Sequence, residues 1–285
     1  MVNVMLNSIA LEPNRFTAEK TPHLDVTKLL PIIAKAGFTA IEMWQYHISG
    51  KTLEEVKAVR QLGDSLGLTF PVIGAYPVFH LEGEDAEKEK ATQMGLIERA
   101  EILGSPVIKM FLGRIKGSEI TPEQLKLTDD RVGSWMAAAK ARNIRFCAEL
   151  HDNTLFDPEE TGEAFLARNP DMGMGVCYQP YDFQNTDACL ALADRFAGRI
   201  IHVHLQGHGA DNGHATPWGQ NLRSLEESAI DYCQLLPRIN DANPGVTYGI
   251  EFVRSGMGPA EELDYDVALA EALKDKVFAE AILDK

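Results

Sequence analysis

The sequence predicts one closed (β/α)8 barrel, a TIM barrel of the α/β class, because short β-rich runs alternate strictly with longer amphipathic runs. The 285 residues hold eight runs of each kind. Strict alternation implies a parallel sheet, and eight units are enough to close it. No linker or low-complexity segment interrupts the series, so we expect residues 1–285 to form a single domain. A doubly wound open sheet is the alternative, but no GxGxxG turn follows an early strand.

Each strand candidate is a short run rich in β-branched and aromatic residues. Strands are expected at 2–6, 39–43, 69–75, 107–112, 144–150, 173–178, 200–205 and 246–252. Helices are expected at 25–36, 52–66, 85–103, 121–142, 158–168, 187–196, 222–239 and 259–283. Helix signals mark their ends, among them the capping box of Thr52 and Glu55. In the fourth helix Pro122 follows the cap Thr121, and a break is expected near Thr128.

The charge balance argues against two classes of partner. Lys and Arg number 27 against 42 Asp and Glu, which gives a formal net charge of −15 and a pI near 5.0. Such a surface repels nucleic acid and anionic membranes, so neither is expected as a partner. The N-terminus resembles no signal peptide, and no apolar run approaches the roughly 20 residues of a membrane span, so a cytoplasmic protein is expected. The four cysteines form no CxxC pair, which favours reduced thiols over a structural zinc site.

Side chains alternate across a strand, and in six of the predicted strands one face is aliphatic while the other carries polar groups. In a barrel the aliphatic face packs against the helices, and the other face points to the axis. Isolated charges near the axis are costly unless they are paired, hydrogen bonded or bound to a metal. The polar groups fall late in each strand, at the end of the barrel where active sites lie. They are Glu42, Lys109, Glu149, Gln179, His202, His204 and Glu251.

The polar groups of strands five to eight predict a divalent metal site. Glu149, His204 and Glu251 are the expected ligands, and the amide oxygen of Gln179 is a candidate fourth. Oxygen ligands with one nitrogen suit Mn²⁺, Mg²⁺, Co²⁺ or Zn²⁺, and we expect Mn²⁺. Any one of these acids can equally be half of a structural ion pair, but their convergence favours a metal. His202 is expected one layer lower, as a hydrogen-bonded core histidine.

Four short motifs carry these candidates: FCAELHD around Glu149, IIHVHLQG around His204, TYGIEFV around Glu251 and GFTAIEMW around Glu42. In order and spacing they resemble the motifs of the xylose isomerase-like barrels, a group that includes ketose 3-epimerases, hydroxypyruvate isomerase and keto-inositol dehydratase. The resemblance covers most of the chain in layout. It implies metal ligation by Glu149, His204 and Glu251, and it implies that Glu42 lies near the substrate.

Two segments depart from the pattern of that family. Its members usually carry Asp after strand six and His three residues later, whereas VCYQPYD offers Gln179 and Asp182. The departure implies two anionic ligands rather than three, and a more strongly Lewis-acidic metal. The segment HLQGHGADNGH has no acid at Gly207 and lacks the arginine that some epimerases place there. Substrate recognition is therefore expected to differ from that of the epimerases.

The leading hypothesis is a divalent-metal-dependent isomerase or epimerase that acts on a keto sugar or related polyol through an enediolate. In the related epimerases the glutamates of strands five and eight move the proton, so Glu149 and Glu251 are expected to be ligands and acid/base groups at once. The substrate-binding candidates are Glu42, Trp44, His80, Lys109, His151 and Asp182. Lys109 can instead pair with an acid, and His151 can be a solvated loop histidine.

Three alternatives stay open. A lyase can use the same enolate to expel water or a glycosidic group, and the altered strand-six segment supports this rival. An abasic-site endonuclease of the same barrel type needs phosphate-binding charge, which the acidity opposes. A non-catalytic sugar-binding subunit is the third. The lack of a Gly-rich loop or a basic cluster favours an unphosphorylated substrate, and the Gly- and His-rich segment 206–220 is expected to form a lid or a contact in a homodimer or homotetramer.

Overall fold

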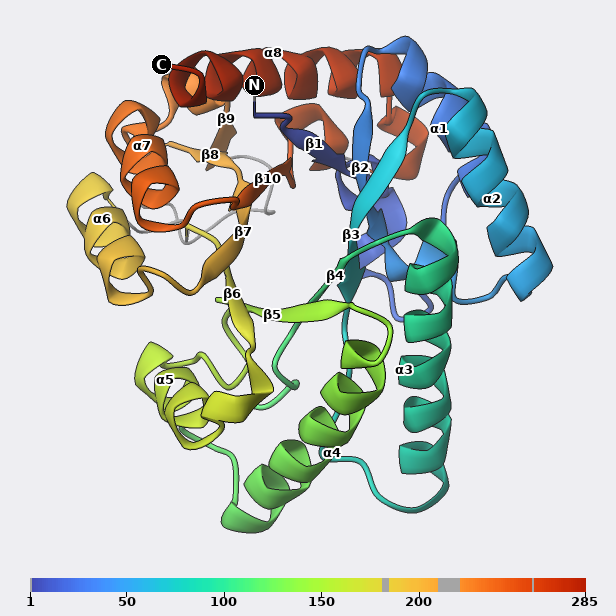
Figure 1. The fold of residues 1–285 in the computed structure, drawn as a ribbon. Helices are drawn as coiled ribbons and strands as arrows, with labels where there is room; N and C mark the ends of the chain where they lie inside the picture. The colour runs from blue at the N-terminus through green and yellow to red at the C-terminus, as the bar shows by residue number, and fades with distance from the viewer. Residues whose placement is uncertain (1, 181–184, 210–220, 258) are drawn as a thin grey trace.

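Eight parallel strands close into a barrel, as the alternation in the sequence predicts (Figure 1). The computed structural model describes residues 2–180, 185–209, 221–257 and 259–285. The strand order around the barrel is β1-β10-β7-β6-β5-β4-β3-β2. The barrel strands are β1 Met5–Asn7, β2 Ala40–Trp44, β3 Thr69–Ala75, β4 Val107–Met110, β5 Arg145–Glu149, β6 Gly175–Tyr178, β7 Ile200–Leu205 and β10 Thr247–Ile250. A separate antiparallel pair joins β8 Gly207–His208 to β9 Leu222–Arg223.

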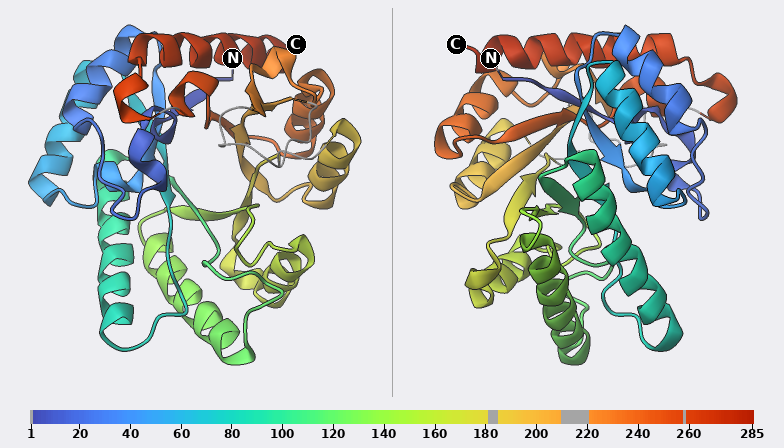
Figure 2. Two further views of the ribbon diagram at one scale, coloured as in Figure 1. Left: turned by 180° about the vertical axis from the view of Figure 1, so that it is seen from behind. Right: turned by 45° about the vertical axis from the view of Figure 1, so that its right-hand side comes forward.

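A ring of α-helices surrounds the barrel, and Figure 2 shows the ring from behind and from one side. The helices are α1 Val26–Lys35, α2 Leu53–Ser65, α3 Gly83–Leu103, α4 Pro122–Lys140, α5 Glu159–Arg168, α6 Thr186–Arg195, α7 Tyr232–Ala242 and α8 Tyr265–Leu283. The predicted capping box of Thr52 and Glu55 is present at the start of α2. No helix in the described part of the chain is both long and apolar enough to cross a membrane.

Three helix predictions are corrected by the structure. α4 runs through Thr128 without a break, and the hydroxyl of Thr128 is satisfied within the helix by donating to the carbonyl of Gln124 at 2.9 Å. The seventh helix begins later than predicted because Leu222–Arg223 pairs with Gly207–His208 instead. The eighth also begins later, because the side chain of Asp264 caps α8.

The barrel interior has an apolar floor and a polar layer above it. The floor residues are Met5, Ala40, Val72, Val107, Cys147 and Cys177. The polar groups follow on the same strands, toward the C-terminal ends, while the opposite faces pack against the helices. Gly74 and Gly249 make room for the polar layer, because a Cβ at either position would lie only 3.1 or 3.3 Å from the carboxylate of Glu42. The sorting of strand faces by alternation therefore predicts the interior correctly.

Candidate metal centre

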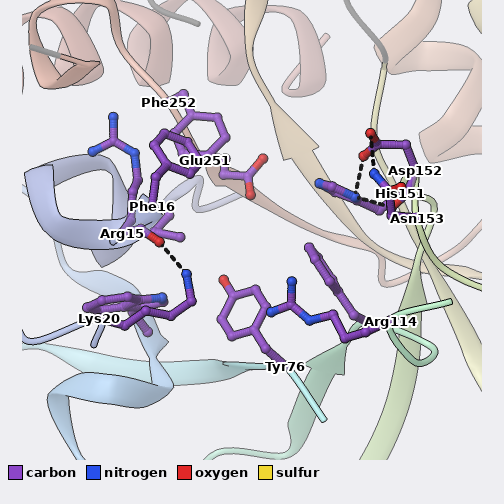
Figure 3. Close-up of a pocket in the computed structure, with 13 residues that line it drawn as sticks. Arg15, Phe16, Lys20, Tyr76, Arg114, His151, Asp152, Asn153, Glu251 and Phe252 are labelled. Atoms are coloured by element: carbon purple, nitrogen blue, oxygen red, sulfur yellow. Dashed lines mark hydrogen bonds and ion pairs between the residues drawn. The ribbon is translucent and has the colours of Figure 1, made fainter. Parts of the chain in front are cut away.

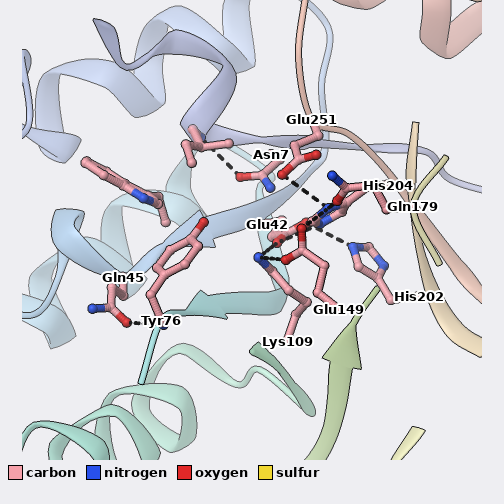
Figure 4. A network of polar contacts seen from close by, with 12 residues as sticks. Asn7, Glu42, Gln45, Tyr76, Lys109, Glu149, Gln179, His202, His204 and Glu251 are labelled. Atoms are coloured by element: carbon pink, nitrogen blue, oxygen red, sulfur yellow. Dashed lines mark hydrogen bonds and ion pairs between the residues drawn. The ribbon is translucent and has the colours of Figure 1, made fainter. Parts of the chain in front are cut away.

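Three side chains from three neighbouring segments converge at the C-terminal mouth of the barrel (Figure 4). Glu149 ends β5, His204 lies near the end of β7, and Glu251 directly follows β10. The parallel register brings them together, because Gly249 pairs with His204 and Glu149 pairs with Cys177 of the intervening β6. One donor atom from each of the three lies within 4.8 Å of the others, and no more than 4% of any of them is exposed.

The donor atoms of this cluster point at one another. His204 Nδ1 lies 3.2 Å from Glu251 Oε1 and 3.4 Å from Glu149 Oε1. Burial would lower the pKa of His204, but Cys177 and the surrounding carboxylates outweigh it and raise that pKa well above its ordinary value. The cluster therefore favours positive charge at its centre, which a proton on Nδ1 or a bound cation can supply. By this criterion the residues fit a divalent metal ion.

Gln179, which directly follows β6, can meet the cluster with either end of its amide. With the oxygen inward, Oε1 lies 3.0 Å from His204 Nδ1 and adds a neutral oxygen donor to the set. With the amide turned over, its nitrogen donates to Glu149 Oε1 at 2.5 Å and to Glu251 Oε2 at 3.3 Å, while its oxygen accepts from Gln206 at 3.1 Å. The turned amide satisfies the carboxylates by hydrogen bonds, whereas the inward oxygen suits a hard cation.

Glu42, on β2, is the acceptor for both histidines of β7. Its Oε2 lies 2.9 Å from His202 Nε2 and 3.1 Å from His204 Nε2, and the carboxylate is fully buried. Burial would raise the pKa of Glu42, but His204 and His202 hold it well below its ordinary range. An ionised Glu42 keeps a proton on His204 Nε2 and leaves Nδ1 facing the cluster. His202 is also bonded to Thr247 through Nδ1 at 2.8 Å, so both its nitrogens are used within the core.

Lys109, on β4, is an ion-pair partner of the same carboxylates. Its Nζ lies 2.5 Å from Glu149 Oε2 and 4.0 Å from Glu42 Oε1, and its side chain is fully buried. Burial would lower the pKa of Lys109, but Glu149 and Tyr76 outweigh it and raise that pKa well above its ordinary value. The ammonium lies 4.7 Å from the centroid of the Tyr76 ring, a favourable cation–π distance. Of the two roles that the sequence leaves open for Lys109, the structure shows the pairing with an acid.

A cavity of about 240 Å³ opens beside Glu251 at the mouth of the barrel (Figure 3). Glu251 is the ligand candidate among its lining residues, so a molecule in the cavity meets the centre at this carboxylate. Phe111 lines the same cavity, and its ring centroid lies 4.3 Å from that of His151. Burial would lower the pKa of His151, but Asp152, 2.7 Å from Nδ1, and Glu149 raise it. His151 is therefore a candidate proton donor within the cavity.

The residues predicted to bind the substrate differ in their position relative to this cavity. Two of them line it, namely Trp44 and His151. Two lie fully buried beneath it, namely Glu42 and Lys109. His80 lies in the loop after β3, partly buried, and does not line the cavity. Asp182 lies outside the described residues, as do positions 210–220 of the predicted lid.

Three basic residues of the cavity are absent from the sequence-based prediction. Arg15 and Lys20 come from the segment between β1 and α1, and Arg114 comes from the loop after β4. They form no basic run in the chain, so the search for a cluster of Lys and Arg missed them. The available signal is topological, because loops that follow barrel strands line the same mouth.

A family model described as a xylose isomerase-like TIM barrel matches residues 30–274. The chain belongs to this family. No curated protein sequence matches the chain in a separate search. Among solved structures, the IolI protein with a bound zinc atom is 15% identical with a TM-score of 0.73, covering 98% of both chains. The probable 3-DHS dehydratase AsbF of Bacillus anthracis is 16% identical with a TM-score of 0.72, covering 95% of this chain and 98% of its own.

D-Psicose 3-epimerase of Clostridium cellulolyticum is another structural neighbour, 14% identical with a TM-score of 0.72 over 99% of both chains. Identities of this size show a shared fold and do not transfer a reaction. These neighbours include an epimerase and a probable dehydratase, so the shared fold does not decide between these reactions. One neighbour carries zinc and another, from Mycobacterium smegmatis, carries magnesium.

Proposed function

We propose that the protein is a divalent-metal-dependent isomerase or epimerase that acts on a keto sugar or related polyol. One observation carries the proposal: two buried carboxylates, Glu149 and Glu251, flank one nitrogen of His204 at the edge of a small cavity. A cavity of this size suits a sugar rather than a larger ligand. Family membership supports the same class of reaction, since its structural neighbours include epimerases.

The proton transfer is assigned to groups of the chain itself. Glu251 faces the cavity and takes a proton from the carbon beside the substrate carbonyl. In an isomerisation the protonated Glu251 returns this proton to the neighbouring carbon. In an epimerisation the opposite face of the same carbon receives a proton from the side of Glu149, which Lys109 holds ionised through a 2.5 Å ion pair. That proton comes from the Lys109 ammonium through Glu149, and the proton on Glu251 returns through solvent to Lys109. A bound divalent metal ion would stabilise the negative charge that develops on the substrate oxygens.

The proposed ligands are Glu149, His204 and Glu251, with Gln179 through its amide oxygen. Mn²⁺ is the proposed ion, because oxygen-rich sites with one imidazole suit it, and Mg²⁺, Co²⁺ and Zn²⁺ are the alternatives. A small sugar or polyol is the proposed partner, and the net charge of −15 argues against nucleic acid and anionic membrane. A cytoplasmic location and a homodimer or homotetramer stay predictions.

A lyase is the second candidate, and His151 is the observation that favours it. Its imidazole lines the cavity with a pKa raised above the ordinary value, so it can protonate a departing hydroxyl or sugar oxygen. Elimination would start with the same proton abstraction by Glu251. It differs in that the bond to the β-substituent breaks and the substituent leaves with the proton of His151.

Incubation in D2O distinguishes these functions. Protein stripped of metal is reloaded with Mn²⁺ and mixed with a panel of ketoses, and proton NMR follows each carbon-bound proton. Exchange without loss of a substituent supports the isomerase or epimerase, whereas release of water or an alcohol supports the lyase. Glu251→Gln, which keeps the shape of the side chain, is expected to abolish the exchange. Protein that gains no activity with Mn²⁺, Co²⁺ or Mg²⁺ on any substrate of the panel would contradict the proposal.

A further inference from the structure

Arg114 presents an uncommitted guanidinium to the cavity. Its Cζ lies 4.8 Å from the centroid of Phe111 and 5.5 Å from that of Tyr76, so two aromatic rings hold it in place (Figure 3). No hydrogen bond or ion pair joins Arg114 to the residues that the structure describes. An arginine carries five N–H donors in a rigid fork that matches a carboxylate or phosphate, and no residue in the described part of the chain accepts from any of the five.

Two further cations line the same cavity, and we call the three together the cationic rim: Arg15, Lys20 and Arg114. Lys20 Nζ donates to the carbonyl oxygen of Arg15 at 2.7 Å and makes no ion pair within the described chain. Burial and then the nearby charge of Arg114 lower the pKa of Lys20, so two like charges lie near each other on the wall of this cavity. Arg15 is 3% exposed, its guanidinium donates to the carbonyl oxygens of Glu12 and Gly256, and burial lowers its pKa while the charges of Glu251 and Glu12 oppose that shift. The positive charge of the rim that no described carboxylate pairs with therefore lies on Lys20 and Arg114.

The rim is close enough to the buried cluster for one small molecule to reach both. Lys109 Nζ lies 4.7 Å from the Tyr76 centroid and Arg114 Cζ lies 5.5 Å from it, which limits the distance between the two cations to about 10 Å. Glu251 lines the cavity together with Arg114. A ligand with a polyol end at Glu251 and a charged end at Arg114 fits this arrangement.

We propose that the cationic rim binds an oxyanion group of the substrate, a carboxylate or a phosphate. The substrate class then narrows to a keto sugar acid or a keto sugar phosphate. The polyol part of this statement rests on the proposed function, but the anion site does not. In a chain of net charge −15, anions are repelled at long range, so a local group of uncompensated cations is what an anionic substrate needs. This inference opposes the expectation of an unphosphorylated substrate, which relied on the lack of a basic cluster in the sequence.

The test is calorimetric binding of three probes to the full chain loaded with Mn²⁺. D-Fructose is the neutral probe, 5-keto-D-gluconate carries a carboxylate, and D-fructose 6-phosphate carries a phosphate. At least one anionic probe is expected to bind tenfold or more tightly than D-fructose, with an affinity that falls as salt rises. The anionic probe that binds more tightly shows whether the cationic rim recognises a carboxylate or a phosphate. Equal binding of all three probes, or no binding of either anion, would overturn the inference.

Arg114→Gln assigns the preference to a residue. This substitution should weaken binding of the preferred anion about tenfold or more, because charge-assisted hydrogen bonds are lost. The affinity for the neutral probe D-fructose should stay the same. Arg114→Lys should restore only part of the affinity, since an ammonium lacks the planar fork. Arg142→Gln is the matched control, because Arg142 pairs with Glu101 on the surface outside the cavity. An anion preference that survives Arg114→Gln unchanged would also overturn the inference.

The two proposals fail separately. If the anion preference depends on Arg114 but no ketose exchanges a carbon-bound proton in D2O, the proposed function is wrong and the anion site stands. If neutral ketoses exchange a proton and Arg114→Gln changes nothing, the proposed function stands and the anion site is wrong.

Discussion

Replacement of Glu42 by Gln isolates the role of a carboxylate that lies beneath the cluster. Glu42 accepts from the Nε2 atoms of His202 and His204 at 2.9 and 3.1 Å. An amide of the same shape offers one acceptor oxygen and one donor group, so it cannot accept from both histidines with equal strength. We expect Glu42→Gln to release His204 from its fixed tautomer and to weaken metal binding.

The expected magnitude follows from the position of Glu42 behind His204. Carboxylates that orient a ligating imidazole typically contribute 10- to 100-fold to metal affinity, which corresponds to roughly 1.4–2.8 kcal/mol. The loss of the negative charge of Glu42 also lowers the metal affinity, because this carboxylate is fully buried and its electric field at the cluster is weakly screened. We therefore expect a fall in Mn²⁺ affinity between these limits, with folding retained because Lys109 keeps its 2.5 Å pair with Glu149.

Competition with a fluorescent chelator measures the affinity, and nitrogen-15 NMR of the histidine rings reports the tautomer of His204. Asp275→Asn is the matched control, since Asp275 is another buried acid and lies outside the cluster. A Glu42→Gln protein that binds Mn²⁺ within twofold of the wild type, with His204 still protonated on Nε2, would refute this reasoning. A loss of affinity in Asp275→Asn of equal size would refute it as well.

Three further outcomes are expected from single substitutions. Burial, opposed by a backbone hydrogen bond, raises the pKa of Asp275 to about 7 from 3.8, so the folded state binds this proton more tightly and loses stability as pH rises through that window. Asp275→Asn should raise the free energy of unfolding at pH 8 by up to about 4 kcal/mol and leave it unchanged at pH 4, and the melting temperatures at the two pH values check this. Gly74→Ala should cost roughly 1–3 kcal/mol in urea denaturation, since its Cβ would lie 3.1 Å from Glu42, while Gly50→Ala, with open space around it, should cost little. Gln179→Asp should bind Mn²⁺ more tightly than the wild type in the same chelator assay, and unchanged affinity would show that position 179 is not a ligand.

Much of the barrel follows from local patterns in the chain. The alternation of β-rich and amphipathic runs is enough to predict eight units, and the two-residue period of each strand predicts which groups point to the axis. The same reasoning cannot predict the β8–β9 pair, because two paired residues per strand leave no periodicity to detect. Leu222–Arg223 therefore looks like the start of the next helix. Only contacts across the mouth of the barrel show that it is not.

The same distinction between local patterns and long-range contacts applies to the residues of the site. Alternation assigns Glu42, Glu149 and Glu251 to one interior face, but it does not show which of these three carboxylates faces the cavity and which lies beneath it. The partner of Lys109 was equally undetermined, because the pairing with Glu149 is set by the register of β4 against β5. The cationic rim comes from two loops far apart in sequence, where no period applies. What the sequence leaves open is therefore long-range and concerns loops.

The charges of the buried layer give a physical reason for a neutral residue at position 179. Glu42, Glu149 and Glu251 bring three negative charges, and Lys109 brings one positive charge. With neutral imidazoles the layer carries two net negative charges, which one divalent cation balances. A fourth carboxylate would leave an unbalanced charge in a low-dielectric interior, where such a charge is costly. In the proposed centre Gln179 would supply an oxygen without that charge. Lys109 and Gln179 would then act in the same direction, because both reduce the negative charge that the cation must neutralise.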